Sequence, residues 1–82
     1  MYYIYILLCS NKSYYVGYTT ALKNRYKQHC WGLVKYTKNR RPLKLIFSEE
    51  FNNKEDALKR EKQLKGWSRK KKEKLIELKT KI

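Results

Sequence analysis

The chain has 82 residues, with 21 lysines and arginines against 7 aspartates and glutamates, and a formal net charge of +14. This length predicts one domain, residues 1–82, with a thin core. No apolar run reaches the roughly 18 residues of a membrane span, and residues 2–8 lack the basic flank of a signal peptide. The two cysteines, Cys9 and Cys30, form no CxxC pair, which argues against a disulfide-built scaffold. We therefore expect a cytoplasmic protein with reduced thiols and no membrane partner.

The first third of the chain predicts a hairpin followed by a helix. Residues 2–8 (YYIYILL) are β-branched and aromatic, which favours a central strand covered on both faces. A polar turn at 10–12 precedes a second strand at 13–19, so the two strands pair as a hairpin. Thr20 is the expected N-cap of a helix over 21–30, in which Leu22, Tyr26 and Cys30 share one stripe.

The remaining elements complete an α+β domain. A basic loop over 31–43, broken by Gly32 and Pro42, leads into a third strand at 43–47. Asn53 is the expected cap of a helix over 54–65 that ends at Gly66. Ser68 is expected to cap a last helix, whose apolar residues are Leu75, Ile76 and Leu78. The order is ββαβαα, with a small, mainly antiparallel three-stranded sheet flanked by helices.

The charge predicts a polyanionic partner, in most proteins nucleic acid. Disorder is disfavoured because 15% of residues are aromatic and only one is proline. Residues 1–48 contain no carboxylate, so acid-dependent chemistry has few positions available. The expected contacts to a nucleic-acid backbone come from the basic loop and the 69–74 run: Lys35, Lys38, Arg40, Arg41, Lys44, Arg69, Lys70, Lys71 and Lys72.

Three familiar kinds of site are excluded. One histidine and no cysteine pair give no ligand set for structural zinc. Glu49 and Glu50 are adjacent on or beside a strand, so they point to opposite faces and cannot form a carboxylate dyad. The isolated Gly17 and Gly32 form no phosphate-cradling loop.

A set of tyrosines and polar residues remains. All eight tyrosines lie within the first 36 residues, and alternation places Tyr5 on one strand face and Tyr15 on the same face as Gly17. Arg25 and His29 are i,i+4 neighbours, and Glu61 lies among apolar residues of its helix. Each feature also has an ordinary explanation: an aromatic core, a solvated basic face, or an ion pair of Glu61 with the lysine at 65.

Together these residues resemble the GIY-YIG nuclease superfamily. Tyr3-Ile4-Tyr5 is followed after nine residues by Tyr15-Val16-Gly17, and Arg25, His29 and Glu61 stand in register with the family pattern. Tyr3 occupies the position of the first glycine, a change that is harmless if the side chain packs. The stretches 36–38, 41–43 and 61–67 resemble the small stand-alone bacterial branch of uncharacterised GIY-YIG domain proteins.

The resemblance implies a Mg-dependent endonuclease that hydrolyses phosphodiester bonds in nucleic acid, DNA rather than RNA, with low sequence specificity. It makes Glu61 the ligand of one Mg²⁺ or Mn²⁺ ion, Tyr5 the general base aided by His29, and Tyr15 a positioning group. Arg25 would bind the phosphate and favour the Tyr5 phenolate. A homodimer or a protein partner would supply targeting.

Two other hypotheses stay open. One is a non-catalytic module that binds RNA or DNA on the same fold. The other is a cationic interaction protein that does not bind nucleic acid.

Overall fold

A computed structural model describes residues 1–80 and contains a three-stranded antiparallel sheet with three α-helices in the order ββαβαα. The elements are β1 (Tyr2–Leu8), β2 (Tyr14–Thr19), α1 (Leu22–Cys30), the short 3₁₀ helix η1 (Lys38–Arg40), β3 (Lys44–Phe51), α2 (Lys54–Lys65) and α3 (Arg69–Thr80). The predicted α+β fold and element order are confirmed. Residues 81 and 82 of the predicted domain lie outside the described residues. No helix within residues 1–80 is long and apolar enough to cross a membrane.

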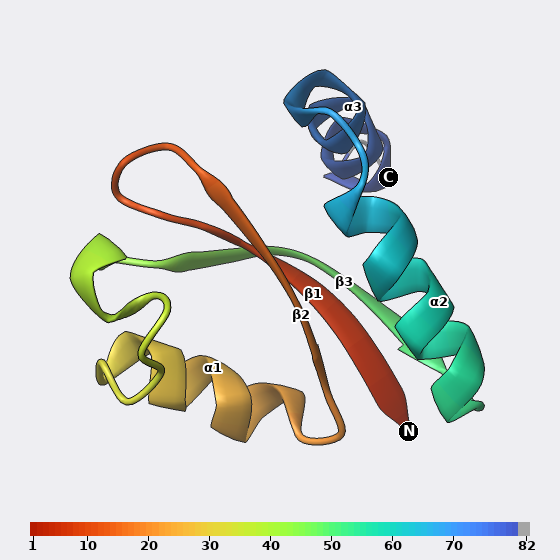
Figure 1. Cartoon of the computed structure of the whole chain (residues 1–82), viewed down its shortest axis with the longest axis horizontal. Coiled ribbons are helices and arrows are strands. Elements are labelled where there is room, and N and C mark those ends of the chain that lie inside the picture. The colour runs from red at the N-terminus through yellow and green to blue at the C-terminus, as the bar shows by residue number, and fades with distance from the viewer. Residues whose placement is uncertain (81–82) are drawn as a thin grey trace.

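The strand order is β2-β1-β3, so the apolar strand β1 is central, as predicted. Helix α1 lies on one face of the sheet, and α2 with α3 covers the other (Figure 1). Because side chains alternate along a strand, β1 feeds two separate cores. Ile4 and Ile6 pack with Ala57 and Leu64 of α2. Tyr5 and Leu7 of β1 pack on the opposite face against side chains of α1.

Three local expectations are wrong. Helix α1 begins at Leu22 with Ala21 as its N-cap, because the hydroxyl of Thr19 rather than Thr20 accepts from the Ala21 amide at 3.0 Å. On the inward face of α1 the residue that follows Tyr26 is the buried His29. Cys30, which was expected there, is exposed.

Strand β3 runs on to Phe51 instead of ending at 47, because the start of β1 pairs with residues 49–51. In α3, Leu75 and Ile76 pack against the core, whereas Leu78 is exposed. Two predicted helix caps are confirmed: the Asn53 side chain accepts from the Glu55 amide at 2.8 Å, and Ser68 Oγ accepts from the Lys71 amide at 3.3 Å.

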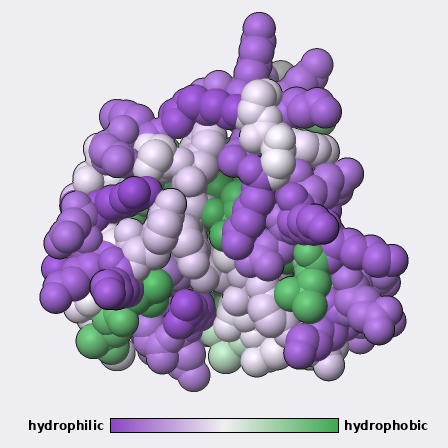
Figure 2. Space-filling view, viewed as in Figure 1, coloured by the Kyte–Doolittle hydropathy of each residue, from purple (hydrophilic) through white to green (hydrophobic). Residues whose placement is uncertain are grey.

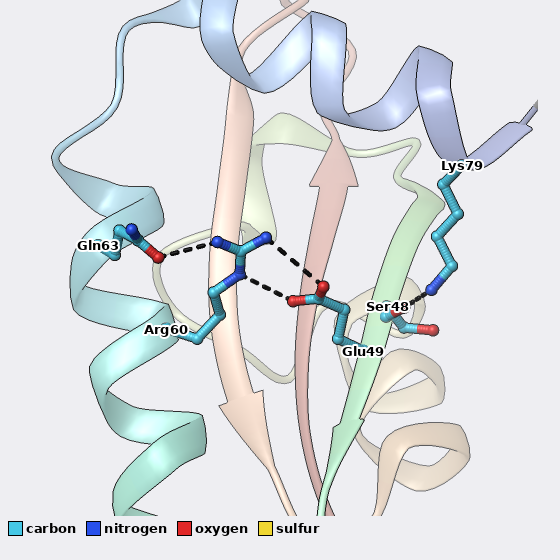
Figure 3. A network of polar contacts seen from close by, with 5 residues as sticks. All are labelled: Ser48, Glu49, Arg60, Gln63 and Lys79. Atoms are coloured by element: carbon cyan, nitrogen blue, oxygen red, sulfur yellow. Dashed lines mark hydrogen bonds and ion pairs between the residues drawn. The ribbon is translucent and has the colours of Figure 1, made fainter.

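Polar contacts hold α2 and α3 against β3 (Figure 3). The Arg60 guanidinium donates to the Glu49 carboxylate at 2.9 Å and to Gln63 Oε1 at 2.8 Å. Lys79, near the end of α3, donates to the carbonyl of Ser48. These contacts fix α2 on its β3 side, while its other flank faces β2, which is the opposite edge strand of the sheet.

The register places Tyr5 directly opposite Gly17 of β2. A Cβ at Gly17 would lie 2.4 Å from both Cζ and Oη of Tyr5, so the phenol ring lies across the backbone of β2 at this residue. A glycine is required here because only its missing side chain leaves room for the ring. The Tyr5 hydroxyl thereby extends from the central strand over the edge strand.

Gly17→Ala should destabilise the fold by about 1–3 kcal/mol, because the buried ring must shift and repack. Gly66→Ala is the matched control: the nearest atom to its Cβ would be 3.5 Å away, and its φ of −82° suits alanine. There we expect a small gain of about 0.4–1 kcal/mol. Chemical denaturation of both variants measures the difference, and equal effects at the two glycines would contradict the close approach.

Candidate active site

Three buried side chains form a hydrogen-bonded chain from β1 through α1 to the 31–43 loop. Tyr5 Oη lies 2.8 Å from His29 Nε2, and His29 Nδ1 lies 2.7 Å from Thr37 Oγ1. Thr37 Oγ1 also donates to the Val34 carbonyl at 3.5 Å. Both His29 and Thr37 are fully buried, and Tyr5 is 1% exposed.

The direction of this chain follows from the single proton of threonine. Since Thr37 donates that proton to a carbonyl, its oxygen accepts from Nδ1–H of His29. The neutral imidazole then carries its lone pair on Nε2, which accepts from the Tyr5 hydroxyl. This hydrogen-bond pattern assigns the tautomer with the proton on Nδ1, in which the Tyr5 hydroxyl donates to His29 Nε2.

The electrostatics favour neutral side chains at both ends of the Tyr5–His29 bond. Burial, with a smaller contribution from the Arg25 guanidinium, lowers the pKa of His29 to about 4. Burial raises the pKa of Tyr5 to about 12, and nearby Arg25 only partly offsets this. Arg25 favours the Tyr5 phenolate, as expected, but desolvation outweighs the guanidinium, so the net effect of the protein is to raise the pKa of Tyr5.

Tyr15 joins this buried chain to the surface. Its ring centroid lies 5.2 Å from that of His29 and 6.2 Å from that of Tyr5. On its other side, 5.4 Å away, is the ring of Tyr36, which is largely exposed in the 31–43 loop. Tyr15 thus lies between the buried Tyr5–His29 pair and the exposed ring of Tyr36.

Arg25 and Glu61 affect the pKa of Tyr5 from opposite faces of the sheet. Arg25 stands one helical turn before His29 in α1 and lowers the pKa of Tyr5. Glu61 belongs to α2, on the far face, yet its charge raises the pKa of Tyr5. The two faces meet here because the Tyr5 ring crosses β2 at Gly17. The structure thus places Tyr5, His29 and Tyr15 in direct contact and Arg25 beside Tyr5, whereas Glu61 is related to them only through its charge.

Glu61 is a half-buried carboxylate with one ion-pair partner. Its side chain is 19% exposed, and its Oε2 lies 3.4 Å from Nζ of Lys65. The i,i+4 pair suggested by the sequence therefore exists. Within residues 1–80 no group of three or more histidine, cysteine or acidic side chains could surround a metal. A lone, partly exposed carboxylate fits Mg²⁺, which binds one or two carboxylates and keeps several waters.

The nine lysines and arginines predicted to bind a nucleic-acid backbone differ in their exposure and in their contacts. Seven are exposed, and Arg40 and Lys72 are half-buried. Arg41 makes hydrogen bonds within the protein: its guanidinium donates to the carbonyls of Lys38 at 3.0 Å and Cys30 at 3.5 Å. Lys72 lines a groove of about 420 Å³ over β2 together with Tyr14, Tyr15, Val16, Tyr36 and Lys65.

Sequence reasoning missed Thr37 as part of the site and Tyr36 and Lys65 as lining of the groove. Thr37 stands eight residues after His29 in an irregular loop, where no periodicity relates the two side chains. The only sequence signal was the Tyr36-Thr37-Lys38 stretch, which matched the family pattern without indicating a role.

The chain is similar to known proteins over most of its length. The family model of the GIY-YIG catalytic domain matches residues 1–74. A UPF0213 protein of Limosilactobacillus reuteri is 47% identical over 78 residues, covering 92% of this chain and 81% of that protein. One from the archaeon Natronomonas pharaonis is 41% identical over 75 residues, 90% of this chain and 88% of that protein, so such relatives are not confined to bacteria.

A solved structure is also similar. The solution NMR structure of a UPF0213 protein from Bacillus halodurans has 44% sequence identity and a TM-score of 0.65, covering 96% of this chain and 86% of that one. The names of these relatives state no activity.

Thr37→Val should lower the free energy of unfolding by about 1–3 kcal/mol, because Nδ1–H of His29 loses its acceptor in a dry site. Valine keeps the shape of threonine, so the change isolates the hydroxyl. Thr20→Val, at an exposed position, is the control and should change stability by less than about 0.5 kcal/mol. Indistinguishable melting curves for the two variants would show that the bond carries no stability.

The low pKa of His29 predicts a pH-dependent stability. In the unfolded chain His29 binds a proton near pH 6.5, whereas in the folded chain it does so only near pH 4. The contribution of neutral His29 to the free energy of unfolding is therefore complete above pH 6.5 and is lost as the pH falls from 6.5 to 4. Between pH 7 and 4.5 the parent should lose about 2–3 kcal/mol more than His29→Gln. Denaturation across this range tests it, and parallel pH curves would contradict the assignment.

Proposed function

The chain belongs to the GIY-YIG catalytic domain family, and from this premise we propose that it is a metal-dependent endonuclease hydrolysing phosphodiester bonds. The proposed substrate is nucleic acid, DNA in preference to RNA, with low intrinsic sequence specificity. The observation that carries the proposal is the bond from Tyr5 Oη to His29 Nε2, with Arg25 and Glu61 close enough to act on the same phenol.

The Tyr5–His29 pair supplies a route for the proton of an attacking water. Tyr5 Oη keeps a free lone pair because its own proton is held by Nε2 of His29. The oxygen takes a proton from water as its own passes to His29, which becomes an imidazolium. The new P–O bond forms as the P–O bond to the leaving oxygen breaks. The low pKa of His29 opposes this transfer until an anionic phosphate lies nearby to stabilise the cation.

Arg25 and Glu61 would handle the remaining charges. The planar guanidinium of Arg25 is suited to two oxygens of one phosphate. Glu61 would hold the single Mg²⁺ or Mn²⁺ ion, which neutralises charge on the phosphate and leaving oxygen when bound. Lys65, whose Nζ lies 3.4 Å from the Glu61 carboxylate, would then be available to bind the substrate.

The net charge of +14 supports binding to the phosphate backbone. Such contacts position a duplex or strand without identifying its sequence. The charge therefore favours low specificity, and we propose that a second copy or a partner protein supplies targeting.

Glu61→Gln should abolish Mg²⁺-dependent cleavage, because glutamine keeps the shape of the side chain and removes the charge that holds the ion. Affinity for DNA should stay equal or rise slightly, since one negative charge is gone. Glu73→Gln is the matched control: Glu73 forms an exposed i,i+4 pair with Arg69 at 3.8 Å, and its variant should cleave normally. The measurement is cleavage of labelled DNA across a Mg²⁺ titration, with melting temperature recorded at each point.

Two outcomes would overturn the proposal. Full activity of Glu61→Gln would remove the metal-ligand role and leave the ion pair with Lys65 as the function of this carboxylate. Binding without cleavage by the parent on every DNA and RNA structure tried would favour the non-catalytic module.

A further inference from the structure

We infer that the groove over β2 binds one unpaired nucleotide, so that the substrate is single-stranded where it enters the site; this rests on the function proposed above. The groove has a volume of about 420 Å³ and is lined from four segments: β2, the 31–43 loop, α2 and α3. Its size falls within the roughly 300–1,000 Å³ of sites for small organic molecules. It therefore has room for a nucleotide but not for a duplex.

The aromatic lining favours a base. Tyr14, Tyr15 and Tyr36 all line the groove, and the Tyr36 side chain is 62% exposed. Aromatic rings that face solvent beside a basic groove are the usual platform on which single-stranded bases stack. Paired bases are already stacked on both faces inside a duplex, so only an unpaired base can use such a platform.

The charged lining favours the phosphate that accompanies the base. Lys65 and Lys72 project into the groove from α2 and α3, and none of its lining residues is acidic. Two arginines extend the positive charge along its rim, since Arg40 lies 4.6 Å from the Tyr36 ring and Arg69 lies 4.5 Å from the Tyr14 ring. In Figure 2, hydrophilic side chains likewise surround a paler, less polar strip in the middle of this face.

The groove is continuous with the candidate active site. Tyr15 belongs to both, because its ring contacts His29 on one side and Tyr36 on the other. Lys65 also belongs to both, because it lines the groove and pairs with Glu61. A nucleotide held here would place an adjoining phosphate near the Tyr5 hydroxyl.

Binding in the absence of metal tests this inference separately from catalysis. The probes are a fluorescent oligothymidylate and a blunt hairpin duplex, titrated in EDTA and followed by anisotropy. Tyr36→Ala should weaken binding of the oligothymidylate about 5- to 150-fold and leave the duplex nearly unchanged. Tyr36→Phe keeps the ring and should bind like the parent.

Trp31→Ala is the matched control, since Trp31 is a 67% exposed aromatic that does not line the groove. It should bind both probes like the parent. Melting temperatures close to the parent's would show that both alanine variants are folded, as expected for exposed rings. Equal losses in Tyr36→Ala and Trp31→Ala, or equal losses on both probes, would overturn the inference.

The two proposals can fail independently. If Tyr36→Ala loses affinity for the single strand while the parent cleaves no substrate, the inference about the groove is supported and the proposed nuclease function is contradicted. If the parent cleaves with Mg²⁺ and Tyr36→Ala binds the oligothymidylate as well as the parent does, the proposed nuclease function is supported and the inference about the groove is contradicted.

Discussion

The hydrogen bond between Tyr5 and His29 is the interaction on which the rest of the candidate site depends. It joins the central strand to α1 and, through Thr37, to the irregular loop that follows. Each donor in this buried chain has an acceptor, and no buried side-chain polar atom among the described residues lacks a partner. A site built this way is rigid, because removing one group leaves another unsatisfied in a dry environment.

The crossing of the Tyr5 ring over Gly17 explains how a small sheet joins chemistry from both of its faces. Helices α1 and α2 lie on opposite faces and pack on separate cores (Figure 1). A side chain of β1 would ordinarily meet groups from one face only. Because glycine leaves the edge strand bare, the phenol reaches a position that Arg25 of α1 and Glu61 of α2 both influence.

Charge is distributed so that the two half-buried carboxylates, Glu49 and Glu61, have defined partners. Glu49 is bound by Arg60, which holds α2 to β3, and Glu61 pairs with Lys65 beside the groove. With no acid before residue 49, nothing in the first half of the chain competes for a cation or repels a phosphate. Positive charge therefore dominates the first half of the chain, and the half-buried Glu61 pairs with a lysine that lines the groove.

The sequence by itself determined the fold class, the order of elements and the central place of the first strand. These follow from local physics: alternation of apolar residues, helix caps such as Asn53, and breakers such as Gly66. It also predicted which five polar residues belong together, because their spacing matches a family pattern. Local patterns gave wrong predictions for the start of α1, the end of β3 and the burial of Cys30. At these positions, strand pairing or packing with distant residues determines the structure.

Only the tertiary structure decided the protonation of the site and the members of the groove. The pKa of Tyr5 rises because burial outweighs Arg25, and burial is a property of the packed molecule rather than of neighbours in sequence. Thr37, Tyr36 and Lys65 acquire their roles from a loop and a helix that meet β2 in space. No local period relates these three residues to β2, so their places in the site and the groove could be recognised only after the chain had folded.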